Sequence, residues 1–324
     1  MTDNAGLVAA FVLDGQGGGK PLDWNGIHQW TPEAGTIWVH LDYSHPQAAS
    51  WLEERSGLDE TITLALLAEE TRPRSVAGHG GLLVVLRGVN MNPGAETEDM
   101  VSIRMFVDER RVITTRQRRV MAIDALRAAL AAGQGPKTST ELLVDIAEGL
   151  TNRIGTVLAE LDDQVDALDD DVADDDSRTL RSTIGTMRRK IVMLRRYIAP
   201  QRDAVAQLHA ERVAWLDDVS RVHLREIADR TTRHVEDLDS ARDRAAVTQE
   251  ELNSRLSERM NRTMYALSII TGIFLPLGLL TGLLGINVGG MPGADNASAF
   301  GIVCGILIAV AILQLIVFKR MRWM

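Results

Sequence analysis

Seven positions of one long apolar segment have the residue types and the spacing to line a path for ions. They recur at intervals of 3-4-3-4-3-4, which places them on one face of an α-helix, and most are small, polar or unbranched. The seven are Asn261, Met264, Ser268, Thr271, Leu275, Gly278 and Gly282. The positions between them are mostly bulky, such as Ile269, Ile273 and Phe274, and suit lipid or a second helix. The pattern predicts a pore face, and the alternative is that small residues merely allow close helix packing.

A pore requires membrane spans, and the sequence contains two candidates. Residues 263–294 and 296–318 contain no Asp, Glu, Lys, Arg or His. Because about 20 apolar residues cross the hydrocarbon layer, segments 265–284 and 298–318 are predicted to be transmembrane helices. A buried helical hairpin of a soluble protein is the alternative, which two such lengths in succession disfavour. One hairpin cannot enclose a water path, so a pore would need several copies of the chain.

The charges beside these spans predict how the chain is oriented. Arg259 and Arg262 precede the first span and three basic residues lie in 319–322, whereas the connecting turn, 285–297, contains neither Lys nor Arg. Because Lys and Arg favour the cytoplasmic side, we expect both termini in the cytoplasm and the turn outside the inner (plasma) membrane. The first 20 residues lack a basic region followed by a long apolar run, so no signal peptide is expected.

The region before the spans divides into two expected parts, a cytoplasmic α/β domain at 1–135 and a long helical stalk or funnel at 136–262. The first part alternates short apolar runs with helical patterns. Strands are predicted within 6–15, 35–44, 82–91 and 101–116, and helices within 45–57 and 59–70. With the two-helix membrane domain at 263–324, the fold class is an α+β membrane protein.

The stalk begins with a helix whose apolar stripe stays in line for more than seven turns, which requires a partner helix along its length. The stripe comprises Leu143, Ile146, Leu150, Ile154, Val157, Leu161, Val165, Leu168 and Val172. The expected partner is segment 177–208, which Pro200 should break or bend. A third helix starts near 214–220 and contains no Pro or Gly before Gly272. It is expected to run unbroken into the first span.

Several function classes are disfavoured by what the sequence lacks. It contains no Walker loop, nucleophile elbow or zincin helix, so an enzyme is not expected. The net charge of −9 disfavours nucleic acid as a partner. The lone cysteine, Cys304, cannot form a cysteine-rich zinc site and is expected to pack between helices.

The turn after the first span carries a family resemblance. Gly285, Ile286 and Asn287 end that span, an α/β domain and long helices come before it, and a basic end follows. This arrangement resembles the CorA superfamily of divalent-cation channels and transporters, whose signature at this place is Gly-Met-Asn. Isoleucine in the middle position is more typical of the ZntB zinc-transporter branch. Segments 69–74, 114–120, 195–203 and 285–293 are also similar to that branch, and the resemblance covers essentially the whole chain.

The resemblance implies a homopentamer with a cytoplasmic funnel, a pore lined by the first span and a ring of Asn287 at the outer mouth. Five amide oxygens can hold a hydrated dication through its waters and still release it, and the neighbouring glycines permit a tight turn. Asp295 would add negative charge that concentrates cations, with a solvated loop residue as the alternative. His223 and His234 share a helix face and would offer rings of imidazole to zinc, unless they are ordinary surface residues.

Zinc as the transported ion, and its import coupled to protons, also follow from the resemblance. The spans offer one Cys and no His, so zinc would cross largely hydrated. No carboxylate in the first span is an obvious proton carrier, and no cofactor is expected. The nearest alternative is a magnesium or cobalt channel of the same superfamily. An alternative of another class is a membrane-tethered scaffold whose coiled helices bind partners, which would not need a polar stripe.

Overall fold

The computed structural model describes residues 5–171, 177–286 and 297–320. Contacts within the chain divide it into two compact units, Met1–Gln249 and Glu250–Met324. Helix α7, Asp218–Leu284, is continuous, so its two parts belong to different units. This confirms that the third long helix runs without a break into the first apolar span.

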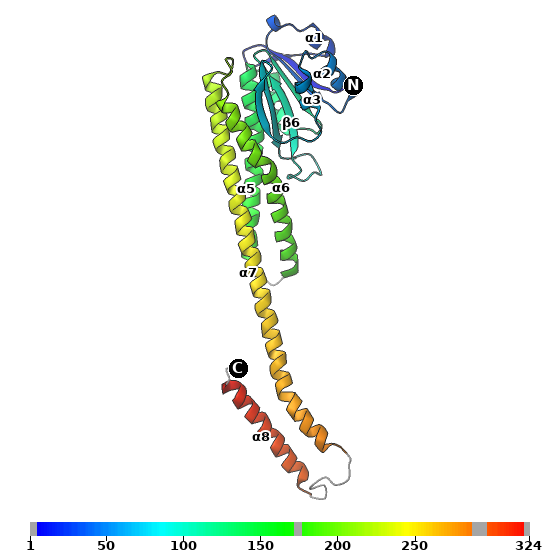
Figure 1. Ribbon diagram of the computed structural model, residues 1–324, viewed down its shortest axis with the longest axis vertical. Helices are drawn as coiled ribbons and strands as arrows, with labels where there is room; N and C mark the ends of the chain where they lie inside the picture. Colours follow the sequence, from blue (N-terminus) through cyan, green and yellow to red (C-terminus); the bar gives the residue numbers. More distant parts are fainter. Residues whose placement is uncertain (1–4, 172–176, 287–296, 321–324) are drawn as a thin grey trace. The chain divides into compact units, whose positions relative to one another are not determined.

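The first unit is built on a seven-stranded mixed sheet of order β2-β1-β3-β7-β6-β5-β4, visible in blue to green in Figure 1. Strands β3 and β7 are parallel, whereas the other neighbouring strands are antiparallel. The strands are β1 Leu7–Leu13, β2 Gly19–Pro21, β3 Ile37–Asp42, β4 Arg74–Gly78, β5 Gly81–Gly88, β6 Val101–Val107 and β7 Arg111–Arg116. The predicted N-terminal α/β fold is therefore confirmed.

The structure adds elements that the apolar patterns did not indicate. Segment 101–116 forms two strands, because Oδ1 of Asp108 accepts hydrogen bonds from the backbone N–H groups of Arg110 (2.9 Å) and Arg111 (2.7 Å) and turns the chain. Strand β2 is three residues long, and edge strand β4 buries only Ser75, so neither shows apolar alternation. The α4 helix, Met121–Ala131, was also not expected.

One face of the sheet is covered by short helices. These are α1 Trp24–Gln29, the 3-10 helix η1 Pro32–Ala34, α2 Pro46–Glu54 and α3 Glu60–Leu67. Side chains of Asp23 and Asp59 cap α1 and α3 by accepting hydrogen bonds from the N–H groups of Gly26 and Thr61, each at 2.8 Å. Leu52 and Leu66 from this layer are buried against the sheet, so α2 and α3 confirm the two predicted helices.

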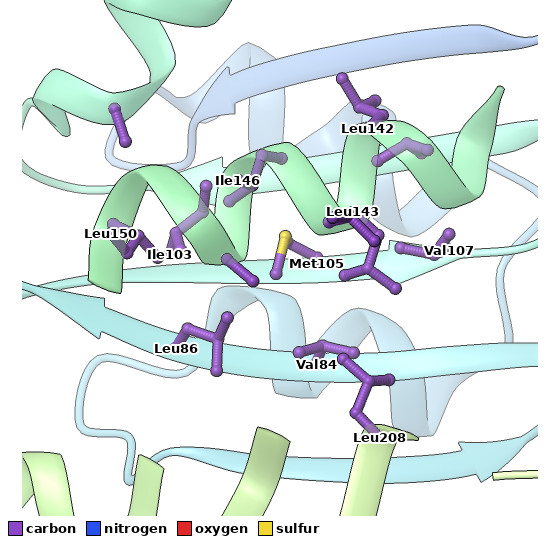
Figure 2. Close-up of a cluster of buried hydrophobic side chains, with 14 of the residues drawn as sticks. Val84, Leu86, Ile103, Met105, Val107, Leu142, Leu143, Ile146, Leu150 and Leu208 are labelled. Carbon is purple, nitrogen blue, oxygen red and sulfur yellow. The ribbon is translucent and has the colours of Figure 1, made fainter. Parts of the chain in front are cut away.

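The opposite face packs against the first long helix, α5, Ser139–Asp171. Figure 2 shows Leu143, Ile146 and Leu150 of α5 lying over Ile103 and Met105 of β6, and all are essentially inaccessible to solvent. Because α5 and the end of α6 share this core with the sheet, sheet and long helices form one unit. The boundaries of a separate stalk domain at 136–262 therefore stay a prediction.

Three long helices lie together beyond the sheet: α5, α6 (Ser177–Ala210) and the first part of α7. The predicted α5 stripe is buried from Leu143 to Leu168, and Val172 lies outside the described residues. Ion pairs fix how the helices align. Arg195 of α6 donates two hydrogen bonds, of 2.6 and 3.1 Å, to the carboxylate of Asp239 in α7. Arg230 of α7 forms an ion pair with Glu148 of α5 at 2.9 Å. Thus α5 contacts α7 as well as its expected partner α6.

Helix α6 continues through Pro200, so of the two predicted outcomes, a break or a bend, the break is wrong. The residues after it hold the helix in place: Ala204, Val205 and Leu208 are buried in the core beside the sheet. The amide oxygen of buried Gln201 accepts a 2.6 Å hydrogen bond from the backbone N–H of Arg87 in β5. Tertiary packing therefore outweighs the one backbone hydrogen bond that proline removes.

A buried histidine makes the stability of the first unit depend on pH. His40 of β3 is fully buried, and its Nδ1 lies 2.7 Å from Oγ1 of Thr114 in β7. Burial, helped by the charges of Arg116 and Arg127, lowers the pKa of His40 to about 3. Between the unfolded pKa of about 6.5 and that value, only the unfolded chain takes up the proton. Stability is therefore lost as the pH falls through this window.

Between pH 6 and pH 5, we expect the unfolding free energy of the wild type to fall by about 1 kcal/mol more than that of His40→Gln. Urea unfolding of the full chain, followed by tryptophan fluorescence, measures this difference. His45→Gln is the matched control, because His45 is exposed. Equal pH slopes for the wild type and His40→Gln would contradict the prediction.

Candidate pore-lining face

The second unit holds two helices long and apolar enough to cross a membrane, the end of α7 and all of α8, Ala299–Arg320. No residue in their most apolar windows is buried inside the chain. A helical hairpin of a soluble core would be covered by other elements, so this exposure agrees with the two predicted spans. In Figure 1, α8 runs back beside the last part of α7.

The seven-residue stripe of α7 is exposed along its whole length. Asn261, Met264, Ser268, Thr271, Leu275, Gly278 and Gly282 are all exposed. On the opposite face of α7, Ile269, Ile273 and Leu277 are half-buried. A Cβ added at Gly278 or Gly282 would meet no atom within 4 Å. The small residues therefore do not serve packing between α7 and α8 of one chain.

Hydroxyl groups on and near the stripe differ in whether they make a hydrogen bond. Ser268 donates to the carbonyl of Met264 at 2.8 Å and Thr281 donates to that of Leu277 at 3.0 Å, as hydroxyls in membrane helices commonly do. Within the described part of the chain, the hydroxyl of Thr271 makes no hydrogen bond. Since an unsatisfied polar group is costly in hydrocarbon, Thr271 is better suited to water than to lipid.

One backbone hydrogen bond is missing within α7, at a point that α8 contacts. Pro276 has no N–H, so the carbonyl of Gly272 four residues earlier loses its helical partner. Gln314 of α8 supplies one, its Nε2 lying 3.5 Å from that oxygen. The sequence analysis did not identify Gln314 as this partner. The available signal was that Gln314 is the single Gln or Asn within 298–318.

The predicted outer turn is only partly within the described residues. The backbone N–H of Gly285 donates to the carbonyls of Thr281 (2.8 Å) and Gly282 (3.2 Å), which ends α7, and Ile286 is exposed. Asn287 and Asp295 lie outside the described residues. Their roles at the mouth stay predictions.

The two histidines proposed for metal binding turn toward α5 of their own chain. Exposed His223 lines a surface cavity with Glu148, whereas His234 is half-buried and its Nε2 would lie 3.1 Å from a Cβ at Gly155. Burial lowers the pKa of His234, Asp237 opposes the shift, and Arg230 and Arg233 add to it. Across residues 5–171, 177–286 and 297–320, no group of three or more His, Cys, Asp or Glu is placed to hold a metal. Metal binding by these histidines stays a prediction.

An α/β unit, long helices and two exposed apolar helices of membrane-spanning length, α7 and α8, together are typical of a membrane protein with a large water-soluble part. The chain matches the family model described as "CorA-like Mg2+ transporter protein" over residues 33–320. It therefore belongs to the CorA family of divalent cation transporters, which confirms the family resemblance.

Known relatives are similar in sequence to this chain along nearly its full length. The chain is 45% identical to the divalent cation transporter CmaX of Pseudomonas aeruginosa, covering 99% of this chain and 98% of that protein. It is 36% identical to the zinc transport protein ZntB of Yersinia pseudotuberculosis, covering 98% and 96%.

Solved structures show the same fold. The structure of full-length CmaX covers 99% of both chains with a TM-score of 0.87 and 44% identity. The CorA magnesium transporter of Methanocaldococcus jannaschii covers 98% of this chain and 99% of its own at a TM-score of 0.81. Its 18% identity shows a shared fold alone.

Proposed function

We propose that the protein imports zinc across the inner membrane as a homopentamer, through a central pore lined by α7. The observation that carries the proposal is the exposed stripe from Asn261 to Gly282, on the face turned away from α8. Five copies that present this face to a common axis would enclose a path with small and polar walls, and bulky side chains would face lipid or α8. Both termini would then be cytoplasmic.

The proposed mechanism keeps the ion hydrated. Asn287 amides at the outer mouth would bind the waters of the dication weakly enough to permit release, and Asp295 would raise the local cation concentration. Thr271 and Ser268 would offer hydroxyl groups along the path. No bound cofactor and no catalytic residue is required. Of the two stalk histidines, exposed His223 is better placed to meet an ion.

Zinc as the substrate is supported by Ile286 in the signature and by 36% identity to ZntB of Yersinia pseudotuberculosis. The second candidate is a magnesium or cobalt channel, which the family description "CorA-like Mg2+ transporter protein" favours. A hydrated ion contacts few distinguishing ligands, so we expect modest selectivity in either case. The scaffold alternative has no use for an exposed stripe of small and polar residues along an apolar helix.

Ion flux into liposomes that contain the purified full chain tests the proposal. Zinc and magnesium entry would be measured with internal indicators, each with and without an inward proton gradient, beside protein-free liposomes. We expect zinc entry that rises with the gradient and exceeds magnesium entry. Gradient-independent flux that favours magnesium would support the channel instead. Absence of flux for both ions would contradict transport and favour the scaffold.

A further inference from the structure

A polar side chain of α8 lies opposite a point within α7 where proline removes a backbone hydrogen bond. Pro276 leaves the carbonyl of Gly272 without its helical N–H. Nε2 of Gln314 lies 3.5 Å from that oxygen. A carbonyl acceptor requires a donor, so the amide must present its NH₂ group to Gly272.

The surroundings are shaped for this contact. Gly272 has no side chain, and a Cβ there would lie 2.8 Å from Cζ of Phe318, so the end of the Phe318 ring occupies the space that a side chain at 272 would take. Gln314 is half-buried on the side of α8 that meets α7. A polar group in hydrocarbon is costly without a partner, and Gln314 and Gly272 each satisfy one group of the other.

The contact is also suited to being made and released. Its 3.5 Å length is at the upper limit for a hydrogen bond. The other end of the amide, Oε1 of Gln314, is buried and has no hydrogen-bond partner in the described part of the chain. The amide is therefore held through one weak bond. Proline positions in helices are also where bending is easiest.

We propose that Gln314 is a positioning residue for transport, which holds α7 in one conformation at Pro276 by donating to Gly272. The inference rests on the proposed pore function, because Thr271 and Leu275 of the stripe flank this point. When Gln314 donates, these two side chains keep their place on the exposed face. When it releases the carbonyl, α7 bends more freely at Pro276 and the alignment of the stripe is lost.

The test is a double-mutant cycle in the full chain. Gln314→Met keeps the length of the side chain and removes the donor. Pro276→Ala restores the backbone N–H at residue 276, which can then donate to the carbonyl of Gly272. We expect Gln314→Met to lower the maximal dication flux about two- to threefold, the population shift expected for one weak neutral hydrogen bond, with the half-saturating ion concentration unchanged. In the Pro276→Ala background, Gln314→Met should change neither. Leu315→Met, at an exposed neighbouring position, is the matched control.

Two results would overturn the proposal: an equal loss of flux in both backgrounds, or no loss in the wild-type background while the wild type transports. The same cycle is read by thermal unfolding in detergent, which needs no transport. There we expect Gln314→Met to lower the Tm only when Pro276 is present, and additive Tm changes would reject the contact itself. If the wild type carries no ion, the proposed function fails, and the Tm cycle still decides whether Gln314 donates a hydrogen bond to the carbonyl of Gly272.

Discussion

Replacing Asn287 with alanine is expected to reduce dication flux by at least about tenfold. In the proposed pentamer, five amide oxygens accept hydrogen bonds from the hydration shell of the ion. One such bond contributes on the order of 1 kcal/mol, so loss of the ring removes several kcal/mol of stabilisation at the mouth. Because an ion must bind there before it passes, its rate of entry falls with that binding.

Flux into liposomes at a fixed, subsaturating ion concentration measures the effect. Asn296→Ala removes an amide from the same turn and is the matched control, for which we expect little change. Equal flux through the wild type and Asn287→Ala, with equal protein incorporated, would show that Asn287 does not hold the ion.

Replacing Leu143 with alanine is expected to produce the largest loss of stability. Leu143 is fully buried between α5 and the sheet, next to Met105 and Val107 (Figure 2). A buried leucine truncated to alanine loses about 2–5 kcal/mol, because a cavity remains. For a unit of this size, about 3 kcal/mol lowers the Tm by roughly 6–12 °C.

Thermal unfolding of the full chain, followed by tryptophan fluorescence, reports on this unit because five of the six tryptophans lie within Met1–Gln249. Leu64→Ala is the matched control, since Leu64 is 61% exposed in α3 and should shift the Tm little. Similar Tm values for both variants would contradict the packing of α5 on the sheet.

Long periodic patterns in the sequence were sufficient to predict the main architecture. The α5 stripe repeats over many turns, and the absence of Pro and Gly before Gly272 predicted the length of α7. Such patterns are strong signals because the same physical requirement is met again at every turn of the helix. Strand β4 was missed because an edge strand with one buried residue leaves no alternation to read.

The contribution of tertiary contacts was harder to predict. Pro200 was expected to break or bend α6, but the helix is not broken, because packing around Gln201 and Leu208 outweighs one lost backbone bond. A proline within α7 leaves the carbonyl of Gly272 without its helical partner, yet which side chain replaces that partner depends on how α8 lies against α7. The stripe of α7 could be recognised because its spacing is local to one helix, and its exposure is observed; its role as a pore face stays a prediction.

Chemical accessibility of the stripe tests the central claim, that the exposed face of α7 lines the ion path. Cys304 is the single cysteine, so Cys304→Ala provides a thiol-free background. In it, Thr271→Cys places a thiol on the stripe and Ile273→Cys places one on the half-buried opposite face. A charged, water-soluble thiol reagent is predicted to block flux through the Thr271→Cys protein and leave the Ile273→Cys protein unaffected. Block of Ile273→Cys alone, or of neither while both transport, would contradict a pore lined by this face.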